Sequence, residues 1–356
     1  MNNANSNFQC YGAFRPRQGR VRLHTSVLVA LAALAVSAAA ISAAWARAHE
    51  WRGLIGGANQ ITSADLTQKA AHAKEMAQRA EKFLQEAKLA AALPRDPGLW
   101  SADSPWLGDE LTPLVTTLGS LEAKRIAANP DWARVLTFKL HELGVRPSSV
   151  VAAGCSGSFP GLNLSLACAC EALAAKLITV SSVTASTWGA NQPGFTWPEI
   201  ESRLVRAGII GRLSSAVAMG GFADGALDLE PTAREVVRKI QSASAAELGA
   251  SVMRPASLQE SVQQRLAIYA REAAGQSIVL YVNVGGTEAS LGESPAAFHL
   301  RSGFIAARPF DLSPGRGVIA RFAEQGVPTL SLLHVEGLAL EWGVTQASRE
   351  QAGNAF

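Results

Sequence analysis

The sequence predicts an α/β protein: a mostly parallel, doubly wound (Rossmann-like) sheet with helices on both faces, preceded by one transmembrane helix and a helical arm. Three observations support this fold class. After residue 129, short apolar segments alternate with segments of helical spacing. Three of the apolar segments end in glycine-rich turns. Near the N-terminus, residues 26–46 carry no charge over the length of a membrane span.

The net charge of +3 comes from the N-terminal tail. Residues 1–25 contain no acidic residue and four basic ones, so residues 26–356 carry a net charge of −1; the four are Arg15, Arg17, Arg20 and Arg22. Nucleic-acid binding needs clustered Lys and Arg on the binding domain. We therefore expect no nucleic-acid partner, and a small ligand or a polymer is the expected partner.

Residues 26–46 predict a single transmembrane anchor. A helix of this length, rising about 1.5 Å per residue, just crosses a hydrocarbon core of about 30 Å. Because the arginines precede it, the positive-inside rule places residues 1–25 in the cytoplasm and the main domain outside the cytoplasmic (inner) membrane. The segment ends in Ala44-Trp45-Ala46, a pattern that signal peptidase cleaves, so a removed signal stays an open alternative.

Residues 47–128 are expected to form a helical arm and a linker. Thr62 or Ser63 caps a long helix, and Pro94 ends it. The prolines that follow indicate an irregular linker. The arm is expected to act as a stalk or as a small packing element, the α/β domain to cover residues 129–345, and residues 346–356 to form a tail.

The elements of the α/β domain follow from caps and apolar periodicity. Asn129-Pro130 opens a helix that Gly144 closes, and Thr196 with Glu199 forms a capping box. Apolar runs predict strands at 150–153, 178–183, 215–219, 278–284 and 329–334. Further helices are predicted at 162–176, 196–208, 230–240, 258–274 and 317–325.

Glycine-rich turns follow three of these strands, at the end of a parallel sheet where ligands bind. Their backbone N–H groups and small hydroxyls suit an anion such as a carboxylate or a phosphate. The alternative is that the glycines only permit tight turns. Neither dinucleotide nor P-loop fingerprint occurs there. The predicted ligand-binding residues are Gly154, Ser156, Gly157, Ser158, Gly220, Gly221, Gly285, Gly286 and Thr287.

The first turn, residues 154–158, approximates a nucleophile elbow, in which a strained turn exposes a serine. Ser156 is then the nucleophile, His334 the base and Asp224 the acid that orients the base. Other residues can fill the last two roles: His299 as the base, and Asp228 or Asp311 as the acid.

No metal or cofactor is expected. The histidines show no metal-ligand spacing, and four cysteines are too few for a disulfide scaffold in a chain of 356 residues. Cys155 has no cationic neighbour in the sequence that lowers the pKa of its thiol. The cysteines are therefore expected to be buried thiols.

Three strings, at residues 154–163, 218–231 and 282–288, resemble the poly-γ-glutamate system proteins of bacteria. This family consists of membrane-anchored components found with the machinery that makes and exports poly-γ-glutamate. The resemblance implies an accessory role in forming a capsule or secreted polymer. It implies three partners: the synthase and export membrane subunits, the polyanionic polymer and the lipid bilayer. It implies no catalytic residue.

Three functions stay open at this point. The outer domain holds or guides the polymer through its backbone N–H groups. Alternatively, it is an extracytoplasmic serine hydrolase or transferase that acts on the polymer. The third option is a scaffold that binds only its membrane partners, with the glycine turns serving the fold alone.

Overall fold

The computed structural model of the chain describes residues 61–91, 105–211, 213–293, 300–307 and 316–344. The predicted membrane segment at 26–46 and the two predicted tails lie outside the described residues. Among the helices within them, none is long and apolar enough to cross a bilayer. Residues 61–356 group into one compact unit.

The predicted α/β class with a mostly parallel sheet is confirmed. Seven strands form one sheet in the order β6-β5-β3-β2-β7-β9-β8. Neighbouring strands run parallel except β8, which pairs antiparallel with β9, so the sheet is mixed. The strands are β2 (Val150–Cys155), β3 (Lys176–Ser182), β5 (Ser214–Ala218), β6 (Ser251–Val252), β7 (Ile278–Val284), β8 (Gly303–Ile305) and β9 (Thr329–Leu332).

The direction of the strand order reverses once. From β2 the chain steps outward through β3 and β5 to β6, and then returns to place β7 against the other side of β2. The reversal lies between β2 and β7, the two central strands. In open α/β sheets, this switch point is where the loops beyond the carboxyl ends of the strands diverge and leave a crevice.

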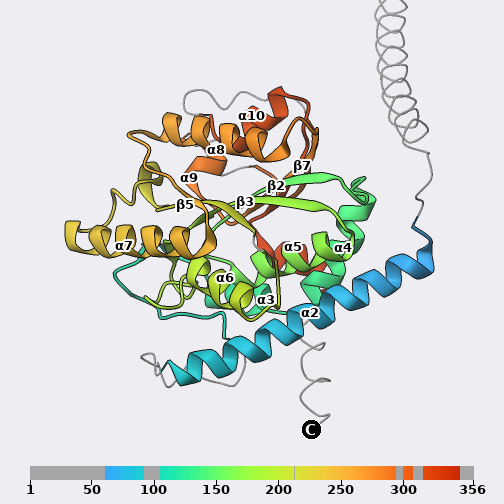
Figure 1. Cartoon of the computed structure of the whole chain (residues 1–356), viewed down its shortest axis with the longest axis horizontal. Helices are drawn as coiled ribbons and strands as arrows, with labels where there is room; N and C mark the ends of the chain where they lie inside the picture. The colour runs from blue at the N-terminus through green and yellow to red at the C-terminus, as the bar shows by residue number, and fades with distance from the viewer. Residues whose placement is uncertain (1–60, 92–104, 212, 294–299, 308–315, 345–356) are drawn as a thin grey trace, which may run out of the picture. The chain divides into compact units, whose positions relative to one another are not determined.

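Helices cover both faces of the sheet (Figure 1). Along β2, Val151 and Ala153 face one hydrophobic cluster, and Val150 and Ala152 face the other. This alternation is expected of a strand buried on both sides. On the first face lie α4 (Asp131–Glu142), α5 (Pro160–Ala172), α6 (Trp197–Arg206), α7 (Pro231–Leu248) and α11 (Val335–Trp342). On the second lie α8 (Leu258–Ala273), α9 (Glu288–Leu291) and α10 (Val318–Glu324).

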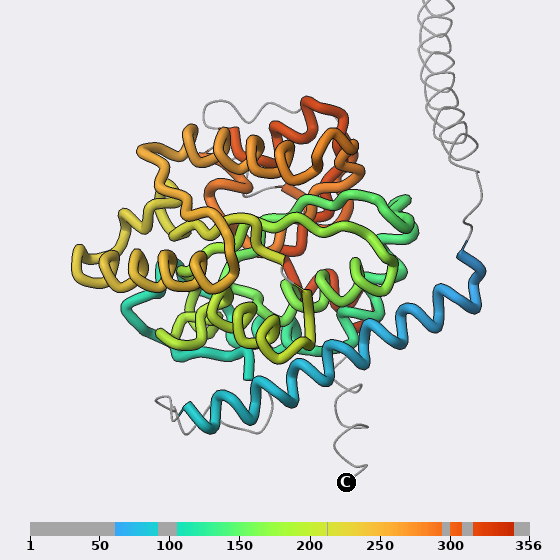
Figure 2. The backbone as a smooth tube through the Cα atoms, in the orientation of Figure 1, coloured from blue at the N-terminus to red at the C-terminus, as the bar shows by residue number. Residues whose placement is uncertain are grey.

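The predicted arm is an integral part of this unit. The long helix is α2 (Ser63–Ala90), and the Thr62 hydroxyl caps it by accepting from the Asp65 N–H at 3.1 Å. Its buried stripe, with Met76 and Leu84 at its centre, belongs to the same core cluster as α4 and α5. Figure 2 shows the helix lying along the edge of the domain. The stripe packs against α4 and α5, so α2 shares one core with the helices that cover the sheet.

The segment after α2 also joins the α/β unit. Lys88, near the end of α2, donates to the carbonyl oxygens of Pro105 and Leu107. Strand β1 (Val115–Thr117) then pairs parallel with β4 (Ala185–Ser186), in a small sheet beside the main one. The helix that follows is α3 (Leu121–Ala127), which Ser120 caps by accepting from the Ala123 N–H. These elements complete one side of the functional site.

Candidate functional site

A pocket of about 490 Å³ opens beyond the carboxyl ends of the parallel strands. Ser156 follows β2, Ser182 ends β3, Gly221 follows β5 and Gly286 follows β7, and all four line the pocket. Because β2 and β7 flank the reversal of strand order, the pocket lies at the switch point of the sheet. Residues of the small sheet of β1 and β4 also line the pocket.

The predicted ligand-binding residues divide into two groups. Five line the pocket: Ser156, Ser158, Gly221, Gly286 and Thr287. The other four pack against neighbouring segments. A Cβ on Gly154 would lie 2.6 Å from the Tyr281 hydroxyl, and one on Gly157 would lie 2.8 Å from the Thr184 carbonyl oxygen. For these glycines the close-packing alternative holds.

Gly220 and Gly285 have a further reason to be glycine. Their φ angles are +81° and +85°, a region that side chains with a Cβ rarely adopt. A Cβ on Gly285 would also lie 2.9 Å from the Ser156 Cβ. The turn after β7 therefore packs tightly against Ser156, which lines the pocket.

The predicted triad is not assembled. Asp224 is buried and its Oδ2 lies 2.7 Å from Arg265 Nη2 of α8. His334 is exposed at the start of α11, where its N–H donates to Ser302 Oγ at 2.9 Å. In the part of the chain that the structure describes, no hydrogen bond joins Ser156, His334 and Asp224. Asp224 therefore orients an arginine, and the structure does not support the triad.

The alternative base and acids do not complete a triad among the described residues either. His299 and Asp311 lie outside the described residues. Asp228 lines the pocket, but its Oδ1 accepts the Phe222 N–H at 2.9 Å and holds the loop after β5. It therefore shapes the pocket wall and does not contact a histidine in the described segments.

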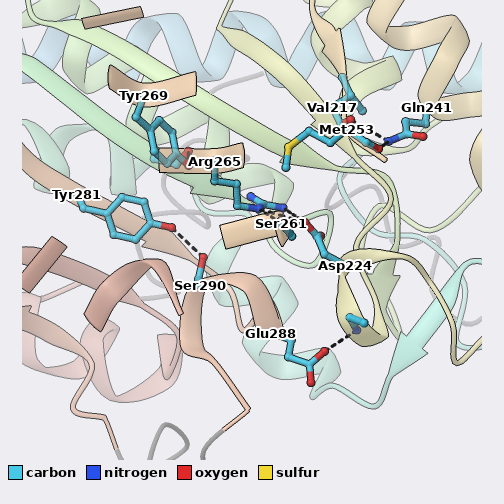
Figure 3. A network of polar contacts seen from close by, with 12 residues as sticks. Val217, Asp224, Gln241, Met253, Ser261, Arg265, Tyr269, Tyr281, Glu288 and Ser290 are labelled. Atoms are coloured by element: carbon cyan, nitrogen blue, oxygen red, sulfur yellow. Dashed lines mark hydrogen bonds and ion pairs between the residues drawn. The ribbon is translucent and has the colours of Figure 1, made fainter. Parts of the chain in front are cut away.

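Asp224 anchors the loop after β5 to helix α8 (Figure 3). Its carboxylate accepts hydrogen bonds from Ser261 and Arg265, both on α8. Burial lowers the pKa of Arg265, but the adjacent carboxylate raises it overall, so the guanidinium stays charged. A buried pair of this kind fixes the loop in one position, because either charge alone is costly inside the protein.

Lys124 of α3 is the basic residue of the pocket and was not among the residues predicted from the sequence. Its side chain is buried, and Nζ donates to the Ser158 carbonyl oxygen and to Ser186 Oγ, both at 2.7 Å. The ammonium group also lies 3.8 Å from the centroid of the Phe159 ring. No carboxylate of the described residues forms an ion pair with it. Burial lowers the pKa of Lys124 to about 7, since water no longer stabilises the charged form.

Two hydroxyl groups of the pocket have no hydrogen-bond partner within the described residues. They are Ser182 Oγ at the end of β3 and Thr287 Oγ1 after β7. Buried polar groups are nearly always satisfied in proteins. Ser182 is only 1% exposed, and neither hydroxyl oxygen has appreciable accessible surface. Both groups therefore lie just behind the surface of the pocket and stay unsatisfied there.

Acidic residues line the side of the pocket formed by the loops after β5 and β7. They are Asp228, Glu288 and Glu293. Glu288 Oε2 accepts the Ala223 N–H, which joins the two loops (Figure 3). Burial raises the pKa of Glu288. The hydrogen bond from the Ala223 N–H lowers it, but the like charges of the neighbouring carboxylates add to the effect of burial, so the pKa is raised overall. The pocket therefore combines one lysine with a group of carboxylates.

Metal and thiol chemistry find little support in the described residues. No cluster of three or more His, Cys, Asp or Glu side chains there has the geometry of a metal site. Cys155, Cys168 and Cys170 are buried free thiols, as predicted. Burial raises the pKa of Cys168 and of Cys170 to about 12, and that of Cys155 still further. These thiols are therefore protonated at neutral pH and unsuited to nucleophilic attack.

The fold and the pocket define an α/β protein with a pocket at the switch point of a mostly parallel sheet. Comparison with known proteins adds no identity, because no family model, curated protein or solved structure matches the chain.

Proposed function

We propose that the pocket binds the carboxylate-bearing end of a γ-glutamyl chain, and that the protein is an accessory, membrane-anchored component of poly-γ-glutamate synthesis or export. The observation that carries this proposal is Lys124, a buried amine that faces a cavity without a carboxylate to pair with among the described residues. A ligand carboxylate beside Nζ supplies that missing charge. It stabilises the ammonium form and so restores the pKa of Lys124 toward its ordinary value.

The other pocket groups support a small, mixed-charge ligand. The half-buried Ser158 hydroxyl lines the pocket and donates a hydrogen bond to a carboxylate or amide oxygen. Asp228, Glu288 and Glu293 repel a long polyanion but attract an ammonium group. An amino-terminal γ-glutamyl residue carries both an ammonium group and a carboxylate. The charges of the pocket therefore favour the end of such a chain over its middle.

In this proposal, residues 1–25 lie in the cytoplasm and residues 26–46 anchor the protein in the inner membrane. The α/β unit then meets the polymer on the outer face, beside the membrane subunits of the synthesis and export machinery. The resemblance of residues 154–163, 218–231 and 282–288 to poly-γ-glutamate system proteins motivates this setting. The near-neutral charge of residues 26–356 also requires that binding be local to the pocket.

Isothermal titration calorimetry of tri-γ-glutamate into the purified full-length protein tests the proposal. We expect saturable binding at physiological salt, weakened at least tenfold by Lys124→Met. Binding to the wild type is expected to weaken as the pH rises above about 7, because free Lys124 then loses its proton. An N-acetylated trimer, which lacks the ammonium group, is expected to bind more weakly than the free trimer.

The control is Lys82→Met, which removes the same charge from an exposed position on α2. It is expected to bind like the wild type. The proposal fails if the trimer does not bind to folded protein, or if Lys124→Met binds as tightly as Lys82→Met. It also fails if binding is unsaturable and vanishes with salt, since that behaviour indicates bulk charge attraction.

A further inference from the structure

Ser186 is the hydroxyl of the pocket that directly contacts a basic side chain. It lies on β4, is 5% exposed and lines the cavity. Its Oγ is 2.7 Å from Lys124 Nζ, and its backbone N–H donates to Ser158 Oγ at 3.0 Å. Lys124 Nζ is itself fixed by the Ser158 carbonyl oxygen. The serine and the amine therefore hold each other in one arrangement at the pocket surface.

Ser156, the serine predicted from the elbow-like turn, lacks such a neighbour. Its Oγ accepts the Ser158 N–H at 3.1 Å, and no basic side chain of the described residues makes a hydrogen bond to it. A serine hydroxyl is a weak nucleophile unless an adjacent base removes its proton. By this criterion Ser186 is the activated serine of the pocket and Ser156 is not.

Lys124 has the properties that a base requires. An amine accepts a proton only in its neutral form, and burial brings its pKa to about 7, so both forms are populated near neutral pH. Across the pocket it faces Asp228, Glu288 and Glu293, and Glu336 of α11 approaches its helix through the Ser120 hydroxyl at 2.9 Å. None of these carboxylates forms an ion pair that would hold Lys124 in its charged form.

We propose that Ser186 and Lys124 form a serine–lysine dyad, and that the pocket catalyses acyl transfer or hydrolysis on an amide or ester substrate. This activity goes beyond ligand binding and does not depend on which acyl compound enters. The Ser158 hydroxyl lines the same cavity, accepts the Ser186 N–H and has no acceptor of its own within the described residues. It is the group available to stabilise the oxyanion of the intermediate.

The reaction needs no co-reactant other than water or a second nucleophile. Ser186 Oγ attacks the substrate carbonyl carbon while its proton passes to Lys124 Nζ. The tetrahedral intermediate then collapses: the bond to the leaving amine or alcohol breaks, and that group takes the proton from Lys124. In the second half, water adds to the acyl-serine with Lys124 again accepting the proton, and the carboxylic acid product leaves as Ser186 regains its hydrogen.

Labelling of the full-length protein with an uncharged alkyl fluorophosphonate tests the dyad. Loss of fluoride leaves a covalent phosphonyl adduct on the activated serine. Trypsin separates the two candidates, because cleavage after Lys176 and Arg203 isolates a peptide that contains Ser186 but not Ser156. We expect the adduct in that peptide, at Ser186. We expect the labelling rate to rise with pH through about 7 and to fall at least 100-fold in Ser186→Ala and Lys124→Met.

Ser251→Ala, at an exposed position on β6, is the matched control and is expected to label like the wild type. Circular dichroism verifies that each variant is folded. No adduct on folded wild-type protein overturns the proposal, and so does an adduct on Ser156. Failure here is distinguishable from failure of ligand binding. Binding of tri-γ-glutamate uses protonated Lys124 and weakens with rising pH, whereas labelling uses the neutral amine and strengthens.

Discussion

The Asp224 carboxylate and the Arg265 guanidinium form an ion pair that is almost completely buried, with 2.7 Å between Oδ2 and Nη2 and each side chain 1% exposed. The pair joins the loop after β5, which lines the pocket, to helix α8 on the second face of the sheet. Its role is to hold that loop in place. If Asp224 anchors the loop, its substitution is expected to lower the stability of the fold, and not catalysis alone.

Asp224→Asn is expected to destabilise the protein by about 3 kcal/mol or more, because it leaves Arg265 charged and unpaired in the interior. Urea unfolding followed by circular dichroism measures the loss. The control is Glu235→Gln, which breaks an ion pair with Arg238 on the surface of α7 and is expected to cost less than about 1 kcal/mol. Equal stability of Asp224→Asn and the wild type would contradict the anchoring role.

Lys124→Met is expected to stabilise the fold while it weakens the proposed ligand binding. In the unfolded chain the lysine is protonated up to its ordinary pKa of 10.5, whereas in the folded protein it loses its proton near pH 7. Between these pH values the unfolded state binds more protons, so the wild type becomes more stable as the pH rises. The variant lacks this dependence.

The gain from Lys124→Met is therefore expected to be about 1–3 kcal/mol at pH 7 and to shrink toward zero at pH 10. Thermal unfolding of both proteins at the two pH values measures it. Lys82→Met, on the exposed face of α2, is expected to show no such trend. A gain that is the same at pH 7 and pH 10 would be inconsistent with a buried amine of lowered pKa.

Gly285→Ala and Gly275→Ala are a matched pair that tests how tightly the turn after β7 packs against Ser156. Both glycines have a positive φ, +85° and +83°, so alanine meets the same backbone strain of about 1 kcal/mol at each. A Cβ at position 275 has open space, but at position 285 it lies 2.9 Å from the Ser156 Cβ. We expect Gly285→Ala to cost about 1–3 kcal/mol more than Gly275→Ala in denaturant unfolding. Equal costs would show that the turn over Ser156 yields freely.

Most of the sheet could be predicted from the sequence because its strands are continuous apolar runs. Strand β7 occupies residues 278–284, as predicted, and its burial on both faces is what produces such a run. The capping box that opens α6 is also present, with the Glu199 carboxylate accepting the Thr196 N–H at 2.9 Å. These features depend on local chemistry, so the local sequence reveals them.

The small sheet and the lysine at its side could not be predicted in the same way. Strands β1 and β4 span three and two residues and include Thr and Ser, so neither produces an apolar pattern. The burial of Lys124 depends on contacts with Ser158 and Ser186, 34 and 62 residues away in sequence. Glycine-rich turns mark three strand ends in the sequence, whereas the Ser/Thr-rich segment 182–187, which runs from the end of β3 through β4, contains no glycine.

Helix α2 offers the sharpest test of how the chain divides into units. Leu84 is fully buried in the main core, whereas Leu89 on the same helix is 44% exposed. Leu84→Ala is expected to lower the free energy of unfolding of the whole unit by about 2–5 kcal/mol in one cooperative transition, because it leaves a cavity in the shared core. Leu89→Ala is expected to cost less than about 1 kcal/mol. Calorimetry measures both. If α2 were a separate stalk, Leu84→Ala would leave the main unfolding transition where it is in the wild type, so a shift of that transition decides between the two arrangements.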